Sequence, residues 1–205
     1  MPEPGAINKW AEDAEEDRAL LIETLDGKTE AYGRLFEKYR QRVFGVVYRI
    51  LHNEEEALDV VQDAFIKAYQ SLDGLRGGGS FYPWLRKIAC HLAIDNSRSR
   101  KRRQAVEFDD ALHGDSPDET FRGVKPAAAQ PSENVEAAEL NAVILKALDS
   151  LSPSHRAVFV LHAVEDMSYK EISESLDCPL GTVMSRLYYA RRELRSQLEA
   201  TGINL

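Results

Sequence analysis

The sequence predicts an all-α protein of two small helical domains joined by a flexible linker, the second domain containing a helix-turn-helix. Apolar residues recur every three or four positions over most of the chain, which is the spacing of one buried helix face. Helix-start signals stand in front of several of these segments. The stretch 104–132 interrupts the pattern with prolines, acids and few large apolar residues. It is too long for an ordinary connection inside one compact domain.

The N-terminal domain is expected over residues 15–103. Residues 1–14 show no apolar periodicity and are expected to be disordered. Leucines at helical spacing predict a first helix from Glu15 that ends near Gly27. A longer apolar stripe predicts a second helix over 29–51.

A third helix is expected after Asn53, whose side chain can cap it. Three glutamates at 54–56 would occupy its first turn, where negative charge favours the positive helix end. Asp73 and Gly74 stop this helix, and a glycine-rich loop over 75–79 follows.

A fourth, basic helix is expected over 80–103, with Ser80 as its N-cap and Pro83 in its first turn. Three aromatic residues open it, and seven Lys or Arg residues then stand against one acid. The aromatic residues are Phe81, Tyr82 and Trp84, and the basic ones are Arg86, Lys87, Arg98, Arg100, Lys101, Arg102 and Arg103. Rings beside a basic helix suit unpaired nucleic acid, because the rings stack on bases while the cations hold phosphates. The segment is equally compatible with an amphipathic core helix that has a solvated basic face.

Residues 133–205 form the second expected domain. A first apolar face runs through Val135, Ala138, Leu140, Ile144, Ala147, Leu148 and Leu151. Ser152 followed by Pro153 predicts the start of the next helix. Ser168 and Glu171 form a capping box in front of a short helix, and a tight turn then leads into a last helix that ends near Leu198.

The last two helices are expected to form the helix-turn-helix. The inner spine of the second one is Leu180, Val183, Leu187, Ala190 and Leu194. This spine leaves the remaining side chains exposed: Thr182, Met184, Ser185, Arg186, Tyr188, Tyr189, Arg191 and Arg192. Short hydroxyl side chains at the start of a helix, flanked by arginines, suit a helix that lies in a DNA major groove. An ordinary helical hairpin is the alternative.

An acidic face is expected on the third helix, because Asp59, Gln62 and Asp63 stand three and four residues apart. Clustered carboxylates allow a metal site or an acid–base pair, but no paired His or second acidic cluster accompanies them. A solvated face or a protein-docking face remains. The glycine triplet lacks the GK[ST] of a phosphate-binding loop. The sequence therefore predicts no catalytic residue, no metal and no cofactor.

Composition indicates a soluble globular protein, with 43% hydrophobic and 29% charged residues. No apolar run approaches the roughly 20 residues that span a bilayer, and the acidic start does not resemble a signal peptide. Cys90 and Cys178 are expected to be reduced, buried thiols of a cytoplasmic protein. The net charge of −8 conceals a segregation, because basic residues gather over 86–103 and 186–195 while acids gather elsewhere. Phosphate contacts act within roughly 10 Å, so this segregation matters more than the total.

Two motifs in this order carry a resemblance to a known family. The segments 59–103, which begins DVVQDAF and contains SFYPWLRK, and 148–194, which contains GTVMSR, resemble the extracytoplasmic-function (ECF) sigma factors of bacterial RNA polymerase. Within that family the chain is similar to the sigma-E-like subgroup. The resemblance covers roughly residues 20–103 and 133–200, with a linker between them as in the family.

The resemblance implies a sigma factor that binds core polymerase, recognises the −35 and −10 promoter elements and helps to melt the −10 region. Asp59, Gln62, Asp63 and Phe65 would dock on the clamp helices of the largest polymerase subunit. A flipped −10 base would meet residues of the loop and the basic helix: Leu75, Arg76, Ser80, Phe81, Tyr82, Trp84, Arg86, Lys87, His91 and Arg98. The −35 element would be read by Thr182, Met184, Ser185, Arg186, Tyr188 and Tyr189, with Arg191 and Arg192 on phosphates.

The resemblance also implies partners. The outer surface of the second domain would touch the polymerase flap. An anti-sigma factor wedged between the two domains would hold the protein inactive, in the cytoplasm or at the membrane. Two positions depart from the usual pattern: Met184 replaces a frequent Lys or Arg, and His91 replaces a frequent Asn at the base pocket. An imidazole at position 91 offers different donors and acceptors to a base.

Two other classes of protein compete with this interpretation. A stand-alone helix-turn-helix regulator would share the C-terminal motif, but the first half has no βαβ pattern or phosphoacceptor setting. A metal-dependent nuclease could use Asp59 and Asp63. Cleavage that is undetectable with a divalent ion, or unchanged by Asp59→Asn and Asp63→Asn, would eliminate the nuclease.

Overall fold

The computed structural model describes residues 4–75, 80–111 and 144–200, with side chains over 15–75, 80–100 and 144–200. Within these ranges all regular structure is helical, as the sequence predicts. We refer to residues 4–111 as the N-terminal half and to residues 144–200 as the C-terminal half. The predictions for Arg76, for residues 112–132 and for the helix over 133–143 lie outside the described residues.

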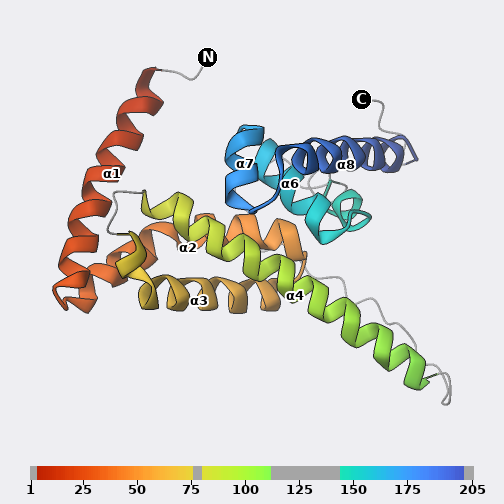
Figure 1. The fold of residues 1–205 in the computed structure, drawn as a ribbon, viewed down its shortest axis with the longest axis horizontal. Coiled ribbons are helices and arrows are strands. Elements are labelled where there is room, and N and C mark those ends of the chain that lie inside the picture. Colours follow the sequence, from red (N-terminus) through yellow and green to blue (C-terminus); the bar gives the residue numbers. More distant parts are fainter. Residues whose placement is uncertain (1–3, 76–79, 112–143, 201–205) are drawn as a thin grey trace, which may run out of the picture.

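Three helices form the body of the N-terminal half: α2 (Thr29–Leu51), α3 (Glu54–Gln70) and α4 (Phe81–Ala111). They pack against one another, while α1 (Pro4–Leu25) packs mainly on α2 (Figure 1). Their apolar stripes meet in a core that includes the fully buried Leu35, Val43, Val47, Phe81 and Leu85. A short 3-10 helix (Leu72–Leu75) follows α3. Burial of these stripes is the main source of stability in such a bundle.

The C-terminal half contains a helical turn over 144–149, then α6 (Pro153–Ala163), α7 (Tyr169–Ser175) and α8 (Leu180–Ala200). The spine of α8 packs on α6 through Val183, Leu187, Ala190 and Leu194, as predicted. Leu180 was expected in this spine but is 47% exposed, so that prediction is wrong. It is the first residue of the helix, where the chain has only just turned out of the preceding loop.

The helix starts predicted at Asn53, Ser152 and Ser168 are confirmed. Asn53 Oδ1 accepts a hydrogen bond from the Glu56 amide at 3.0 Å. Ser152 caps α6, with Pro in the first turn, and Ser168 and Glu171 form the capping box of α7. Each bond satisfies a backbone donor that a helix start would otherwise leave unpaired.

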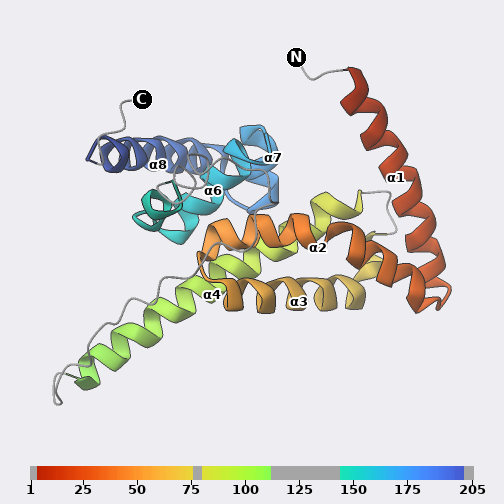
Figure 2. The same cartoon turned by 180° about the vertical axis from the view of Figure 1, so that it is seen from behind.

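Two helices are longer than expected. α1 begins at Pro4, although residues 4–14 were expected to be disordered. This segment contains three alanines, which favour helix even where no apolar stripe is present. α4 continues from 103 to Ala111, because the first glycine or proline after Arg103 is Gly114. The end of α4 projects away from the other helices (Figures 1 and 2).

The two halves lie against each other. α6 packs on α2 and α4, and α7 packs on α4 (Figure 1). One continuous cluster of buried apolar residues includes Val43 and Leu85 from the N-terminal half and Val158 and Leu161 from the C-terminal half. The structure therefore adds an extensive contact between the halves that the sequence did not indicate.

Candidate nucleic-acid and protein interfaces

The acidic residues of α3 lie on an exposed face. Asp59, Gln62 and Asp63 are exposed to solvent. Phe65, which was grouped with them, is 3% exposed. Its ring packs edge-on against Phe36, with the ring centres 4.8 Å apart. Phe65 is therefore a core residue of this structure and not part of a docking surface.

Large apolar side chains flank these acids, although the spacing of the acids did not predict them. Leu58, Ile66 and Tyr69 are 55%, 48% and 43% exposed. With Gln62 they follow helical spacing along one side of α3, next to Asp59 and Asp63. We call these six residues, Leu58, Asp59, Gln62, Asp63, Ile66 and Tyr69, the α3 face. The signal was present in the sequence, because Leu58 and Ile66 fall off the buried stripe of α3.

The first residues of α4 differ in burial although all were expected to meet nucleic acid. Ser80 is exposed and precedes the helix, and its carbonyl accepts from the Trp84 amide at 3.5 Å. Phe81 is 1% exposed, and its ring contacts those of Tyr32, Tyr39 and Trp84. The expectation of a stacking surface at Phe81 is thus wrong in this structure, because its ring completes the core. Leu75 and Trp84 are half-buried.

Tyr82 lies at the contact between the two halves. Its ring stacks on Tyr39 at 5.3 Å, and the Arg42 guanidinium lies 3.9 Å from its ring centre. The hydroxyl donates a hydrogen bond to Glu165 Oε2 at 2.7 Å. Burial, and then the bond to the Glu165 carboxylate, raise the pKa of the Tyr82 phenol. Tyr82 therefore remains a neutral donor to this carboxylate.

Basic residues of α4 make further contacts with the C-terminal half. Arg86, only 8% exposed, pairs with Glu165 at 2.7 Å. Lys87 pairs with Asp177 at 2.6 Å, and this bond is the main reason why the pKa of Asp177 lies below its ordinary value. His91 Nε2 lies 3.6 Å from Asp177 Oδ2.

Further along α4, the exposed Arg98 donates to Ser154 Oγ at 3.3 Å. Five of the residues expected to bind −10 DNA thus contact the C-terminal half: Tyr82, Arg86, Lys87, His91 and Arg98.

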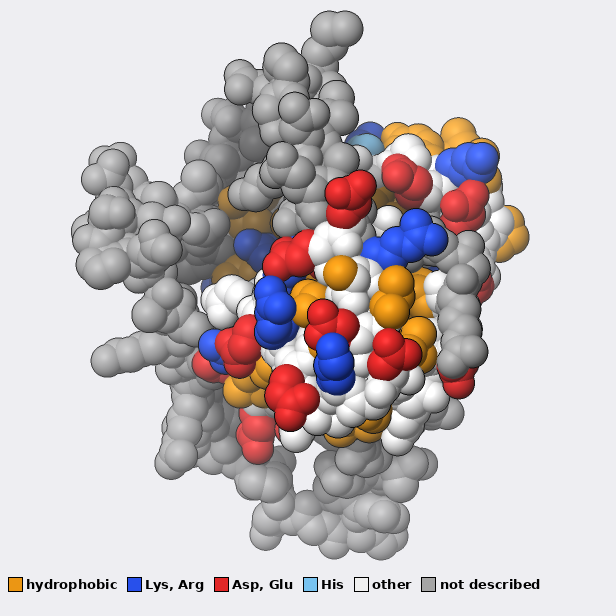
Figure 3. Space-filling view, turned by 90° about the vertical axis from the view of Figure 1, so that its left-hand side faces the viewer, with side chains coloured by type: hydrophobic (Ala, Val, Ile, Leu, Met, Phe, Trp, Pro, Cys, Tyr) orange, Lys and Arg blue, Asp and Glu red, His pale blue; other side chains and the backbone are white. Residues whose placement is uncertain are grey.

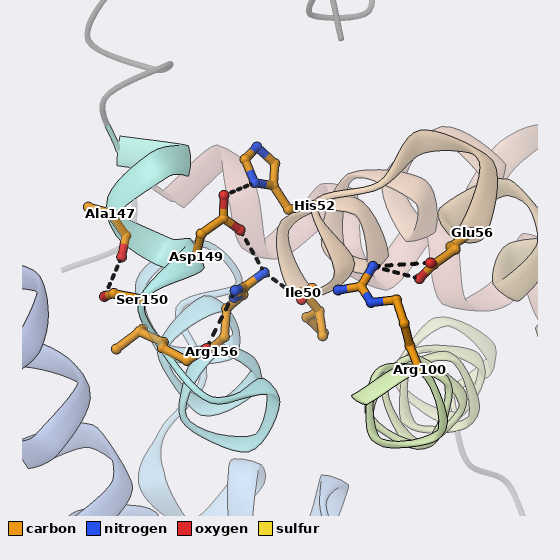
Figure 4. A network of polar contacts seen from close by, with 9 residues as sticks. Ile50, His52, Glu56, Arg100, Ala147, Asp149, Ser150 and Arg156 are labelled. Carbon is orange, nitrogen blue, oxygen red and sulfur yellow. Dashed lines mark hydrogen bonds and ion pairs between the residues drawn. The ribbon is translucent and has the colours of Figure 1, made fainter. Parts of the chain in front are cut away.

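A second set of contacts between the halves lies at the end of α2 (Figure 4). Arg156 Nη1 donates to the Ile50 carbonyl at 3.1 Å and pairs with Asp149 Oδ1 at 3.2 Å. The other oxygen of Asp149 meets Nδ1 of His52, which ends α2 in a left-handed conformation. Burial is the main cause that lowers the pKa of the Arg156 guanidinium. Buried Arg156 thus satisfies an orphan carbonyl at the end of α2.

The polar face of α8 is open. Tyr188, Met184 and Tyr189 are 63%, 53% and 53% exposed, and Ser185, Arg191 and Arg192 are also exposed. Thr182 and Arg186 are half-buried. A groove of about 430 Å³ runs beside them, lined by Tyr169, Met184, Leu187, Tyr188, Arg191, Arg192 and Arg195. Three arginines and two tyrosines around one groove suit a polyanion with planar bases.

Two details set the chemistry of this face. Ser185 donates its hydroxyl to the Thr182 carbonyl at 3.0 Å, so its oxygen can still accept from a ligand. Burial, and then the nearby positive charge of Arg186, lower the pKa of His155. Position 155 therefore adds a neutral imidazole next to the arginines near neutral pH.

The described surface near α1 shows no segregation of charge. On the side of the molecule where α1 lies, acidic and basic side chains are interspersed with hydrophobic ones (Figure 3), as on an ordinary solvated surface.

Cys90 is buried, which raises the pKa of its thiol to about 12, and Cys178 is half-buried. The described residues contain no group of three or more His, Cys, Asp or Glu that could hold a metal ion. Among the described helices none is long and apolar enough to cross a membrane.

Comparisons with known proteins bear on both halves. A family model for Sigma-70 region 2 matches residues 35–103, and one for Sigma-70 region 4 matches residues 142–194. The first match includes α3 and the basic part of α4, and the second ends within α8.

Full-length relatives agree with these matches. The chain is 33% identical over 192 residues to the RNA polymerase sigma-H factor of Pseudomonas aeruginosa, covering 90% of this chain and 95% of the relative. It is 31% identical over 185 residues to the ECF RNA polymerase sigma-E factor of Escherichia coli K12, covering 89% and 94%.

Solved structures share the fold. CnrH in complex with the cytosolic domain of CnrY is similar with a TM-score of 0.61 and 25% identity, covering 90% of this chain and 98% of that one. The sigma factor RpoE in complex with the anti-sigma factor NepR from Bartonella quintana is similar with a TM-score of 0.60 and 24% identity, covering 82% and 96%. Since both sigma-70 regions occur in order and the relatives align over nearly their whole length, the chain belongs to the ECF sigma factors, the subunits that bind core RNA polymerase and direct initiation at promoters.

Proposed function

We propose that this sigma factor uses three separate surfaces: the α3 face to bind core polymerase, α4 to capture the −10 element and α8 to read the −35 element. The observation that carries the proposal is the open face of α8, where Arg191 and Arg192 line a groove at the reading helix of a capped helix-turn-helix. A helix of this kind places its first residues against base edges in the major groove. Arg186 and Ser185 would contact bases, while Arg191 and Arg192 hold phosphates.

The α3 face supports a protein contact better than a metal site. Leu58, Ile66 and Tyr69 are exposed beside Asp59 and Asp63, so carboxylates and apolar surface alternate. An apolar centre with a charged rim is the usual composition of a protein interface. The partner would be the clamp helices of the largest polymerase subunit, and the outer surface of the C-terminal half would contact the flap.

The −10 contact would involve Trp84 as the stacking ring, with Ser80 and His91 near the flipped base. Arg86, Lys87 and Arg98 would bind the phosphates. Extrusion of a base costs a few kcal/mol, which stacking on an aromatic ring and new hydrogen bonds can offset. Leu75 and Arg76 of the preceding loop belong to the same proposed surface.

The chain would act as a non-catalytic specificity subunit of the cytoplasm. We expect an anti-sigma factor to regulate it. RpoE was solved in complex with the anti-sigma factor NepR, and CnrH in complex with the cytosolic domain of CnrY. The chain itself would need no cofactor.

The test is run-off transcription with purified chain, sigma-free core polymerase and the DNA upstream of its own gene. We expect transcripts that require both proteins. Stable association without transcripts would indicate a wrong template. If the chain does not bind core polymerase but binds duplex DNA tightly alone, a stand-alone regulator replaces this proposal.

The α3 face is tested by Asp63→Arg, which replaces an exposed carboxylate by a cation at the centre of the face. We expect the variant to keep its helical content and to lose co-elution with core polymerase at concentrations where the unchanged chain binds. Glu199→Arg makes the same charge change at an exposed position of α8 and serves as the control. The docking assignment would be refuted if Asp63→Arg co-elutes with core polymerase as well as Glu199→Arg and the unchanged chain do.

A further inference from the structure

We propose that the free chain rests in a closed state in which its own C-terminal half covers α4, and that Glu165 controls this closure. The inference rests on the proposed role of α4 in −10 recognition. It adds a regulatory contact within the chain itself, which exists before any anti-sigma factor or polymerase binds.

Glu165 is placed to hold the two halves together. It lies in the loop between α6 and α7, and its side chain is only 6% exposed. One of its oxygens, Oε2, receives three donors from the N-terminal half: Tyr82 Oη at 2.7 Å, Arg86 Nη1 at 2.7 Å and Arg42 Nη2 at 3.4 Å. The two bonds at 2.7 Å have the length of strong charge-assisted hydrogen bonds. A single carboxylate of one half thus neutralises two cations of the other.

The donors around Glu165 are also those that a nucleic-acid phosphate would require. Arg42 and Arg86 flank the Tyr82 ring, at 3.9 Å and 5.3 Å from its centre. Two guanidiniums and a phenol can together hold one phosphate. Because Glu165 fills this position, a −10 strand and the C-terminal half cannot occupy it together. Closure therefore competes directly with −10 DNA.

Other contacts hold the C-terminal half against α4 further along the helix. Asp177, in the turn of the helix-turn-helix, binds Lys87 at 2.6 Å, and the Glu174 carbonyl accepts from the same ammonium at 3.0 Å. Arg156 and Asp149 bind the end of α2 (Figure 4). The acidic residues of the C-terminal half thus face the basic helix of the N-terminal half.

The closed state also has a built-in cost. Arg86 Nε and Arg156 Nε are buried and have no hydrogen-bond partner among the described residues. Burying charged groups with incomplete pairing costs desolvation free energy that their ion pairs only partly return. An opened chain would rehydrate both groups, or bind phosphate with Arg86. Binding of polymerase to the α3 face, which the C-terminal half leaves exposed, could then select the open state.

Two variants of the full-length chain test the proposal. Glu165→Ala removes the carboxylate, and Glu165→Gln keeps its shape but removes its charge. Glu199→Ala is the matched control, because it removes the same charge from an exposed side chain at the far end of α8. Small-angle scattering reports whether the halves separate, and fluorescence anisotropy with labelled single-stranded oligo(dT) reports access to α4.

We expect both Glu165 variants to have a larger radius of gyration and to bind oligo(dT) at least about tenfold more tightly than the unchanged chain. This gain follows because the apparent Kd falls as the open fraction rises. The control should match the unchanged chain in both assays. If Glu165→Ala fails to fold by circular dichroism, Glu165→Gln decides the result.

Unchanged size and unchanged oligo(dT) affinity in the folded Glu165 variants would overturn the closed state, even if run-off transcription succeeds. Expanded variants without a gain in affinity would overturn the competition with DNA. If run-off transcription fails while the variants expand and bind oligo(dT) more tightly, the closed state stands and the proposed promoter role is at fault. The two failures are therefore distinguishable.

Discussion

α4 and α8 are the two helices that the sequence predicts to contact DNA, and the structure presents them very differently. On α8, Tyr188 and Tyr189 are 63% and 53% exposed beside a groove with three arginines. On α4, Tyr82 and Arg86 are 4% and 8% exposed. Both helices carry aromatic and basic residues, so their composition does not explain the difference.

The difference comes from how many sides of each helix are covered. α8 buries one narrow spine, which packs on α6, and leaves the rest of its surface to solvent. α4 buries a core stripe through Leu85 and Ala89, and α6 and α7 cover an adjacent side. A binding surface on a helix thus depends on its neighbours as much as on its own residues.

The largest expected effect separates two kinds of burial on α4. Phe81→Ala should lower the free energy of unfolding by about 3–5 kcal/mol, because it opens a cavity in the core. Trp84→Ala should cost clearly less, since this ring is only half-buried, but it should abolish the −10 contact. Chemical denaturation and run-off transcription measure the two effects. Equal loss of stability in both variants would make Trp84 a core residue and remove the stacking assignment.

The next effect concerns the open face of α8. Arg186→Ala should cost about 1–3 kcal/mol of discrimination between the correct −35 element and a substituted one, if the side chain reads a base edge. Arg191→Ala should weaken binding to all sequences about equally and reduce the salt dependence. Competition assays of the holoenzyme on paired promoters measure both. A uniform loss in Arg186→Ala would instead mark Arg186 as a phosphate contact.

The smallest effect concerns the exposed ion pair between Lys87 of α4 and Asp177 of the C-terminal half. Asp177→Asn removes the ion pair with Lys87, which is largely solvent-exposed and should therefore contribute only about 0–1 kcal/mol to closure. We expect a small rise in oligo(dT) affinity, well below that of the Glu165 variants. An effect as large as theirs would move the main contact from Glu165 to Asp177.

Acidity should loosen the same contact. The hydrogen bond to Lys87 holds the pKa of Asp177 below its ordinary value of 3.8 in the closed state. The pair therefore stabilises closure fully above pH 3.8, and this contribution is lost as the pH falls through the lowered pKa. Scattering between pH 7 and pH 3 on the unchanged chain and on Asp177→Asn tests this direction. The variant should show the weaker pH dependence.

Local signals predicted much of the fold correctly. Asn53, Ser152 and Ser168 each mark a helix start in the sequence and cap that helix in the structure. A single apolar stripe predicted the exposed set on α8 with two exceptions, because Thr182 and Arg186 are half-buried. The helix lengths were less predictable, because neither the start of α1 nor the end of α4 carries an apolar stripe at helical spacing.

The candidate sites were predicted only in part, because periodicity does not report which helices meet. Phe65 and Phe81 belong to motifs but complete the core, whereas Leu58 and Ile66 are exposed beside the acids of α3. No sequence pattern predicted a role for Glu165, since an acid in a short loop is usually solvated. Its role depends on Tyr82 and Arg86, which lie about 80 residues away in the chain.

The sequence by itself determined the all-helical class, the helix starts, the family and the two motif helices. These properties depend on spacing and capping between residues a few positions apart, which the chain carries locally. The tertiary structure alone decided which faces remain available. Burial of α4 and the Glu165 contact arise from two distant segments that share one apolar core, and no local pattern encodes that encounter.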